Sequence, residues 1–180
     1  MAERGVAPFE ILAITFTNKA AGEMKERVAA LVGNRAKAMW VSTFHSACVR
    51  ILRQEAAKLG YSNSFTIYDS SDSLRLITLV MKDMNLDIKR YAPRAVAGLI
   101  SQAKNELQGP ADFVQSADNQ FNEVVAEVFA HYQKRLVSAN AMDFDDLIGR
   151  TVEILQRNPE SRQRYRSRFR HVLVDEYQDT

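Results

Sequence analysis

Two adjacent carboxylates, Asp175 and Glu176, directly follow the apolar run 171–174 near the end of the sequence. Ligands of open α/β sheets bind at the carboxyl ends of the strands. An apolar strand that ends in Asp-Glu is the Walker B pattern: the first carboxylate holds Mg²⁺, usually through water, and the second orients the water that attacks a γ-phosphate. The alternative is a strand that ends in a solvated acidic turn.

A second candidate site lies near the N-terminus, where Phe16 ends the apolar segment 11–16 and a helix is expected to begin around Asn18. An aromatic ring on a strand-to-helix loop offers a stacking face for a nucleic-acid base, and the free N–H groups of a helix start bind phosphate. Phe16 could instead be a core aromatic residue, and His45 a hydrogen-bonded structural histidine.

The elements that must position these residues can be predicted from hydrophobic periodicity. Segment 11–16 is a predicted buried strand. Thr17 or Asn18 can cap a helix that ends at Gly33, and 39–43 is a second strand, so the N-terminus forms a βαβ unit. The helix carries an apolar stripe at Ala20, Met24, Val28 and Leu31.

From Phe44 to Arg157 nearly every segment has helical spacing, and the chain closes with the strand 171–174. The fold class predicted is α/β, mostly helical, with a small parallel sheet of three strands and an all-helical insertion at roughly 60–140. Because such a sheet exposes an edge and apolar surface, we expect self-association, and the insertion should be the best-ordered part.

Composition narrows the class of protein. The 180 residues carry a net charge of +2, with 46% hydrophobic residues, which excludes a disordered tail and suits a globular domain with a core. No apolar run is long enough to span a membrane, and the N-terminus lacks a signal-peptide core. The single cysteine, Cys48, excludes an intramolecular disulfide and suits a reducing cytoplasm.

Two further groups of residues have alternative interpretations. The five arginines between 162 and 170 form either a phosphate-binding cluster or, as we favour, a solvated basic face. Asp143, Asp145 and Asp146 could indicate a metal nuclease, but aspartate is expected at a helix start for capping. The three histidines and Cys48 show no metal-ligand spacing.

Four segments together resemble the UvrD/PcrA/Rep group of superfamily 1 DNA helicases. Segment 175–180 (DEYQDT) resembles motif II, 14–21 (ITFTNKAA) resembles motif Ia, and 41–46 (VSTFHS) resembles the next DNA-contact motif. Segment 142–147 (MDFDDL) resembles the return of the chain to the first motor domain. The matches occur in family order and cover essentially the whole chain.

The resemblance implies a partial RecA-like sheet of the P-loop NTPase type. Residues 1–59 would be part of motor domain 1A, 60–140 the helical 1B subdomain, and 141–180 the return to 1A that ends in Walker B. The implied site residues are as follows: Asp175 binds Mg²⁺, Glu176 binds Mg²⁺ and activates water, Gln178 is catalytic, Asp179 couples the nucleotide site to other motor motifs, and Thr15, Phe16, Asn18, Thr43 and His45 contact single-stranded DNA.

The phosphate-binding pattern G-x-x-x-x-G-K-[ST] has no match among the 180 residues. The resemblance implies a 3′–5′ DNA helicase of repair or replication, and the absence of this pattern implies that the 180 residues are a fragment of it. ATP and Mg²⁺ would be cofactors of the parent enzyme, and neither would bind this chain tightly. The 180-residue chain alone would not hydrolyse ATP. The implied partners are single-stranded DNA, duplex-junction DNA and, through the helical region, a repair protein. The alternatives are a non-catalytic DNA- or protein-binding helical module and a helicase-nuclease subunit.

Overall fold

The computed structural model describes residues 5–179. The chain divides into two compact units. Unit 1 comprises Met1–Leu52 and Val152–Thr180, and unit 2 is the continuous segment Arg53–Thr151 between them. Each unit is described by itself.

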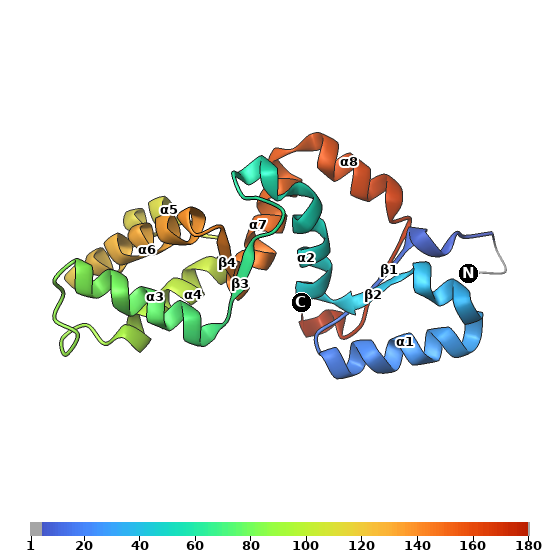
Figure 1. Ribbon diagram of the computed structural model, residues 1–180, viewed down its shortest axis with the longest axis horizontal. Coiled ribbons are helices and arrows are strands. Elements are labelled where there is room, and N and C mark those ends of the chain that lie inside the picture. The colour runs from blue at the N-terminus through green and yellow to red at the C-terminus, as the bar shows by residue number, and fades with distance from the viewer. Residues whose placement is uncertain (1–4, 180) are drawn as a thin grey trace. The chain divides into compact units, whose positions relative to one another are not determined.

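Unit 1 contains a three-stranded sheet in the order β2-β1-β5 (Figure 1). The strands are β1 (Ile11–Thr15), β2 (Trp40–Thr43) and β5 (His171–Val174). Both pairings are parallel, with Ala13 opposite Val41 on one side and Leu173 on the other. The three predicted strands and the parallel βαβ unit are confirmed.

Helix α1 (Asn18–Val32) connects β1 to β2, with the Thr17 hydroxyl accepting a hydrogen bond from the Ala20 N–H at 3.1 Å. Gly33, with φ of 62°, ends the helix as expected. The predicted apolar stripe is only partly correct. Leu31 is 83% exposed, because the last turn of α1 borders an open hollow instead of packing on the sheet.

The core of unit 1 lies on one face of the sheet. Leu12, Ile14 and Trp40 pack there against Ala47 and Ile51 of α2 (Phe44–Glu55). Tyr165 of α8 (Pro159–Arg168) and Phe169 complete the cluster. Ile11 faces the other way and lines the hollow beside α1, so β1 is buried on both faces, as parallel strands usually are.

Unit 2 is built mainly from α3 (Ser70–Asp83), α4 (Pro93–Asn105), α5 (Pro110–Ser116) and α6 (Gln120–Ser138), followed by the first half of α7 (Phe144–Arg157). Its core includes Ile77, Met81, Val96, Phe129 and Leu136. None of the helices in the described residues is long and apolar enough to cross a membrane.

Unit 2 also contains two short parallel strands, β3 (Thr66–Tyr68) and β4 (Ala141–Asp143). The prediction of an all-helical insertion is therefore wrong here. The strands form because Asn140, in the left-handed region with φ of 49°, turns the chain after α6, and its carbonyl accepts the Thr66 N–H at 2.9 Å. Three-residue strands carry too little alternation to be read from sequence. The unit also extends beyond the 60–140 expected.

Candidate functional site

The carboxylates Asp175 and Glu176 lie at the carboxyl end of β5, as the Walker B pattern predicts. The Asp175 N–H donates to the Ile14 carbonyl at 2.9 Å, which places Asp175 beside the end of β1. Glu176 then adopts φ of 54°, a left-handed conformation that is unusual for glutamate and turns the chain sharply out of the strand. Both residues are exposed.

Gln178 lies in a short 3₁₀ turn (Tyr177–Asp179), and its side-chain amide donates to the Glu176 carboxylate. The amide therefore restrains one of the carboxylates that the sequence marked as catalytic. The side chain of Asp179, predicted as a coupling residue, lies outside the described residues, as does Thr180.

The carboxyl ends of β1 and β2 bring together two aromatic rings, one exposed and one half-buried. Phe16 is 43% exposed, whereas Phe44 is half-buried against the core of unit 1, and the two ring centroids lie 5.1 Å apart with an interplanar angle of 47°. Each ring directly follows the threonine that ends its strand, and these threonines, Thr15 and Thr43, are partners in the sheet register. The edge therefore offers the exposed Phe16 ring as a stacking surface, with the half-buried Phe44 ring packed beside it.

Sequence reasoning placed Phe44 on an apolar helix face with Cys48 and Ile51, and its ring does pack against the core of unit 1. What the sequence reasoning missed is that the same ring also lies beside Phe16. The signal that could have found it is the repeated Thr-Phe pair at the ends of two predicted strands.

The other predicted DNA-contact residues differ in how far their side chains are exposed. Thr15 and Thr43 are buried, with 2% and 6% exposure. The Thr43 hydroxyl donates to Ser46 Oγ at 3.0 Å and accepts from the Ser46 N–H at 3.3 Å, so it caps α2. Asn18 is exposed at the start of α1, and His45 is half-buried in the first turn of α2.

The two carboxylates at the end of β5, Asp175 and Glu176, could hold Mg²⁺ only together with further oxygen ligands. Within residues 5–179 no group of three or more His, Cys, Asp or Glu side chains could hold a metal ion. Two carboxylates that leave room for water and phosphate oxygens match the way Mg²⁺ is usually held with a nucleotide.

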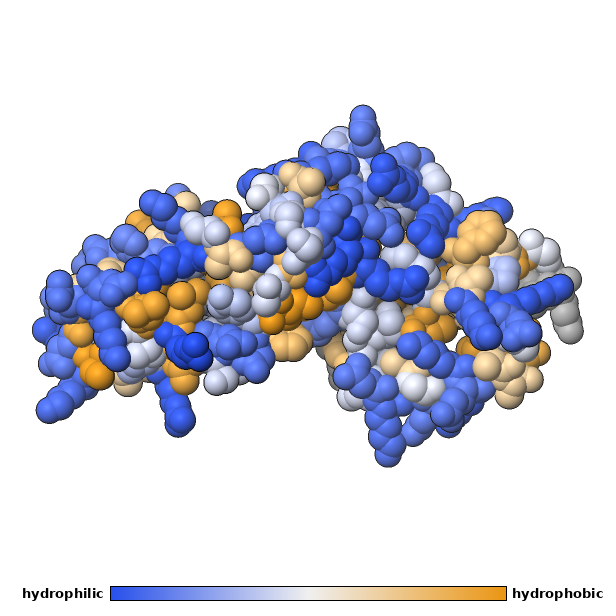
Figure 2. All heavy atoms as spheres, viewed as in Figure 1, coloured by the Kyte–Doolittle hydropathy of each residue, from blue (hydrophilic) through white to orange (hydrophobic). Residues whose placement is uncertain are grey.

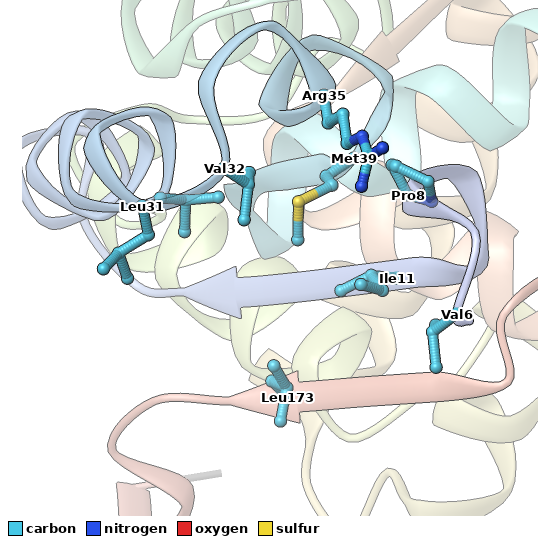
Figure 3. A pocket seen from close by; sticks show the side chains of 9 residues that line it. Val6, Pro8, Ile11, Leu31, Val32, Arg35, Met39 and Leu173 are labelled. Atoms are coloured by element: carbon cyan, nitrogen blue, oxygen red, sulfur yellow. The ribbon is translucent and has the colours of Figure 1, made fainter. Parts of the chain in front are cut away.

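An apolar hollow of about 170 Å³ in unit 1 contains none of the predicted site residues. It is lined by Val28, Leu31 and Val32 of α1, with Ile11 and Leu173 from the sheet (Figure 3). Because Arg35 is the one charged residue among the described residues that line it, the hollow is not suited to bind a nucleotide.

The aspartates at the start of α7 serve a structural purpose in unit 2. Asp143 Oδ1 accepts the Asp146 N–H at 2.8 Å, which confirms the predicted cap. Lys104 Nζ lies 2.6 Å from Asp143 Oδ2 and 3.1 Å from Asp146 Oδ2. A buried lysine therefore takes the position that a nuclease would give to a metal ion.

Comparison with known families decides the assignment. The model of the UvrD/REP helicase N-terminal domain matches residues 1–180. The chain belongs to the UvrD/REP helicase N-terminal domain family. This confirms the resemblance and the fold class drawn from the four sequence segments.

Relatives in the UvrD/REP family are similar over the whole chain. The ATP-dependent DNA helicase UvrD1 of Mycobacterium tuberculosis is 58% identical over 185 residues, and the ATP-dependent DNA helicase PcrA of Bacillus subtilis is 49% identical over 180 residues. Each alignment covers 100% of this chain and 24% of the relative. The chain thus spans about a quarter of the length of these helicases.

Proposed function

We propose that this chain is the part of an ATP-dependent DNA helicase that contributes single-stranded DNA contacts and the Walker B carboxylates. The observation that carries the proposal is the meeting of two groups at one edge of the β2-β1-β5 sheet. The exposed ring of Phe16 and the half-buried ring of Phe44 lie at the ends of β1 and β2, and Asp175 and Glu176 lie at the end of β5 beside β1. The whole protein would translocate 3′ to 5′ on DNA during repair or replication.

At the nucleotide side, Asp175 would hold Mg²⁺ through water and Glu176 would accept the proton of the attacking water. The Gln178 amide would keep the Glu176 carboxylate in place. Bound Mg²⁺ neutralises the negative charge of the phosphates. Asp179 would link this site to neighbouring motor motifs.

At the DNA side, Phe16 would stack on a base, with Phe44 as its neighbour, and Asn18 and His45 would lie near the backbone. The buried Thr15 and Thr43 would shape this edge from beneath. Because β1 pairs directly with β5, a shift at the DNA edge would reach the carboxylates through one strand.

In domain terms, residues 1–59 and 141–180 would belong to motor domain 1A and 60–140 to subdomain 1B. The latter would meet duplex-junction DNA or a repair protein. We propose a cytoplasmic protein. For the 180 residues alone, the exposed ring of Phe16 favours a second function, that of a non-catalytic DNA-binding module.

Replacement of the stacking ring tests the DNA role. Phe16→Ala should weaken binding of a labelled 18-nucleotide oligo(dT), measured by anisotropy, by roughly 5- to 100-fold, since base stacking contributes about 1–3 kcal/mol. The matched control is Phe9→Ala, which removes a 54% exposed ring before the opposite end of β1. Equal losses in the two variants would contradict the assignment.

Glu176→Gln tests the catalytic role in the full-length protein. We expect DNA-stimulated ATP hydrolysis to fall at least 100-fold while nucleotide binding persists, because the proton acceptor is lost and the phosphate contacts remain. The unaltered 180-residue chain should show no ATP turnover, since it has no G-x-x-x-x-G-K-[ST] loop. Turnover in this chain that Glu176→Gln abolishes would contradict its predicted inactivity.

A further inference from the structure

Two arginines lie against one tryptophan at the amino end of the unit 1 sheet. The Arg50 guanidinium carbon is 3.9 Å from the centroid of the Trp40 ring, and that of Arg168 is 4.7 Å from it. Trp40 itself is 2% exposed, and Phe169 meets its ring edge-on at 4.9 Å. Arg50 comes from α2 and Arg168 from the end of α8, so tertiary folding brings the two charges together.

The two positive charges have no acidic partner in the part of the chain that the structure describes. Burial, and then the neighbouring charge of Arg168, lower the pKa of the Arg50 guanidinium. Other arginines of unit 1 do have an acidic partner: Arg170 lies 3.7 Å from Glu10, and Arg157 pairs with Glu153 at 2.6 Å. One stacked guanidinium would be enough to cover the ring, and the second adds repulsion that an anion would relieve.

Stacking also prepares both groups for binding. A guanidinium held over an aromatic ring loses side-chain freedom before any ligand arrives, so less entropy is lost when it binds. Its N–H fork suits phosphate oxygens in a two-point contact. Arg164, one helical turn before Arg168, extends the basic surface along α8.

We propose that Arg50 and Arg168 form a phosphate-binding pair that holds a DNA backbone at the amino end of β2. Trp40 pairs with Leu12 at the start of the shared register, whereas Thr15 and Thr43 pair at its end. The pair is therefore at the opposite end of the strands from the Phe16–Phe44 edge. It adds to the proposed function a DNA contact that does not depend on base stacking. Two guanidinium groups held over one ring match the closely spaced phosphates of a nucleic acid better than the irregularly spaced carboxylates of an acidic peptide.

The test compares Arg50→Gln and Arg168→Gln with Arg166→Gln in the 180-residue chain. Arg166 is exposed on α8, the helix that carries Arg168, and makes no ring contact with Trp40. Arg166→Gln therefore removes one positive charge away from the proposed pair. The probes are a labelled 18-nucleotide oligo(dT), an 18-base-pair hairpin and a labelled polyglutamate peptide, each titrated at several salt concentrations. Thermal unfolding of each variant, together with Arg50→Lys and Arg168→Lys, monitors the fold.

Each glutamine variant at the pair should weaken DNA binding about five- to tenfold near 50 mM salt and lower the salt slope by about 0.7 for the single strand or 0.9 for the duplex. Whichever DNA shows the change identifies the source of the phosphate. Arg50→Lys and Arg168→Lys keep the charge but lose the two-point N–H fork. Their DNA affinity should therefore lie between those of the unaltered chain and the glutamine variants. Arg166→Gln should have less than a twofold effect.

Four outcomes would overturn the inference. The first is an equal loss of DNA affinity in Arg166→Gln, and the second is tighter binding of polyglutamate than of either DNA. The third is weaker DNA binding only in those variants whose thermal unfolding shows that they no longer fold. The fourth is that the unaltered chain does not bind DNA at low salt. If Phe16→Ala weakens binding while Arg50→Gln and Arg168→Gln do not, the phosphate pair fails and the proposed function stands. The reverse pattern removes the stacking site and leaves the phosphate pair.

Discussion

At the scale of single residues, a buried ionic network lies between the helices of unit 2. Lys104 is 7% exposed and lies between Asp143 and Asp146, and the Tyr132 hydroxyl donates to Asp143 Oδ2 at 2.8 Å. Buried charges are tolerated when each one is paired and hydrogen-bonded. These side chains come from α4, α6, β4 and α7, so the network holds four elements at once.

Removing the lysine should be costly. Lys104→Met should lower the free energy of unfolding by about 3–5 kcal/mol, because it leaves the buried Asp143 carboxylate without a cation and Asp146 with Arg150 alone, at 3.4 Å. Chemical denaturation checks this. The control is Arg27→Met, which breaks an exposed pair with Glu23 at 3.9 Å and should cost under about 0.5 kcal/mol. A small effect of Lys104→Met would show that the carboxylates are solvated or protonated.

The same network predicts a loss of stability in alkali. Burial, and then the charge of Asp143, raise the pKa of the Tyr132 hydroxyl well above its usual value. The folded state therefore keeps this proton where the unfolded chain loses it, so stability is fully present below about pH 10 and falls as the pH rises further.

Tyr132→Phe should flatten that fall between pH 10 and 11, measured as unfolding free energy by denaturant titration. Tyr177→Phe, at a 74% exposed position, should leave the slope unchanged. An unchanged slope in Tyr132→Phe would contradict the assignment.

At the scale of elements, two helices begin directly at the end of a strand. Thr43 ends β2 and caps α2, and Asp143 ends β4 and caps α7. No loop separates strand from helix in either case, so the cap decides where the chain turns. Thr43 thereby also sets the position of Phe44 at the candidate DNA edge.

Thr43→Val should lower the free energy of unfolding by about 1 kcal/mol, since it keeps the buried shape and removes the capping hydroxyl. Thermal or chemical denaturation would measure the loss. Thr43→Ser, which keeps the hydroxyl, should retain most of the stability. If Thr43→Ser is no more stable than Thr43→Val, the methyl group of Thr43 and not its capping hydroxyl provides the stability.

At the scale of the whole molecule, β5 is an edge strand with apolar side chains in the open. Val172 is 54% exposed and Leu173 is 47% exposed, and Leu173 borders the hollow beside α1. Figure 2 shows apolar side chains among hydrophilic ones on the surface of unit 1. Unpaired edges with apolar side chains promote association.

We therefore expect the 180-residue chain to self-associate with rising concentration. Leu173→Lys should shift it toward the monomer in light scattering, because a charge on an edge strand blocks further pairing. Lys19→Glu, a charge change at an exposed position on α1, serves as the control. A monomeric unaltered chain would contradict this prediction.

Much of the fold could be predicted from local sequence. The three strands of unit 1 are short apolar runs with clear ends, and Thr17, Gly33 and Pro93 mark helix boundaries through capping and backbone geometry. Asp-Glu at the end of β5 and the four motif-like segments were enough to identify the family and the candidate site.

Tertiary structure decided what local sequence could not. Strands β3 and β4 pair across a long stretch of chain, and Lys104 meets Asp143 only when α4 folds against β4 and α7. The sequence predicted Phe16 as a stacking ring, but its partnership with Phe44 follows from the register of β1 and β2. The exposure of Leu31 and the meeting of Arg50 with Arg168 over Trp40 likewise depend on packing. Periodicity reports which residues share a face of one element, whereas burial and charge pairing depend on which other element covers that face.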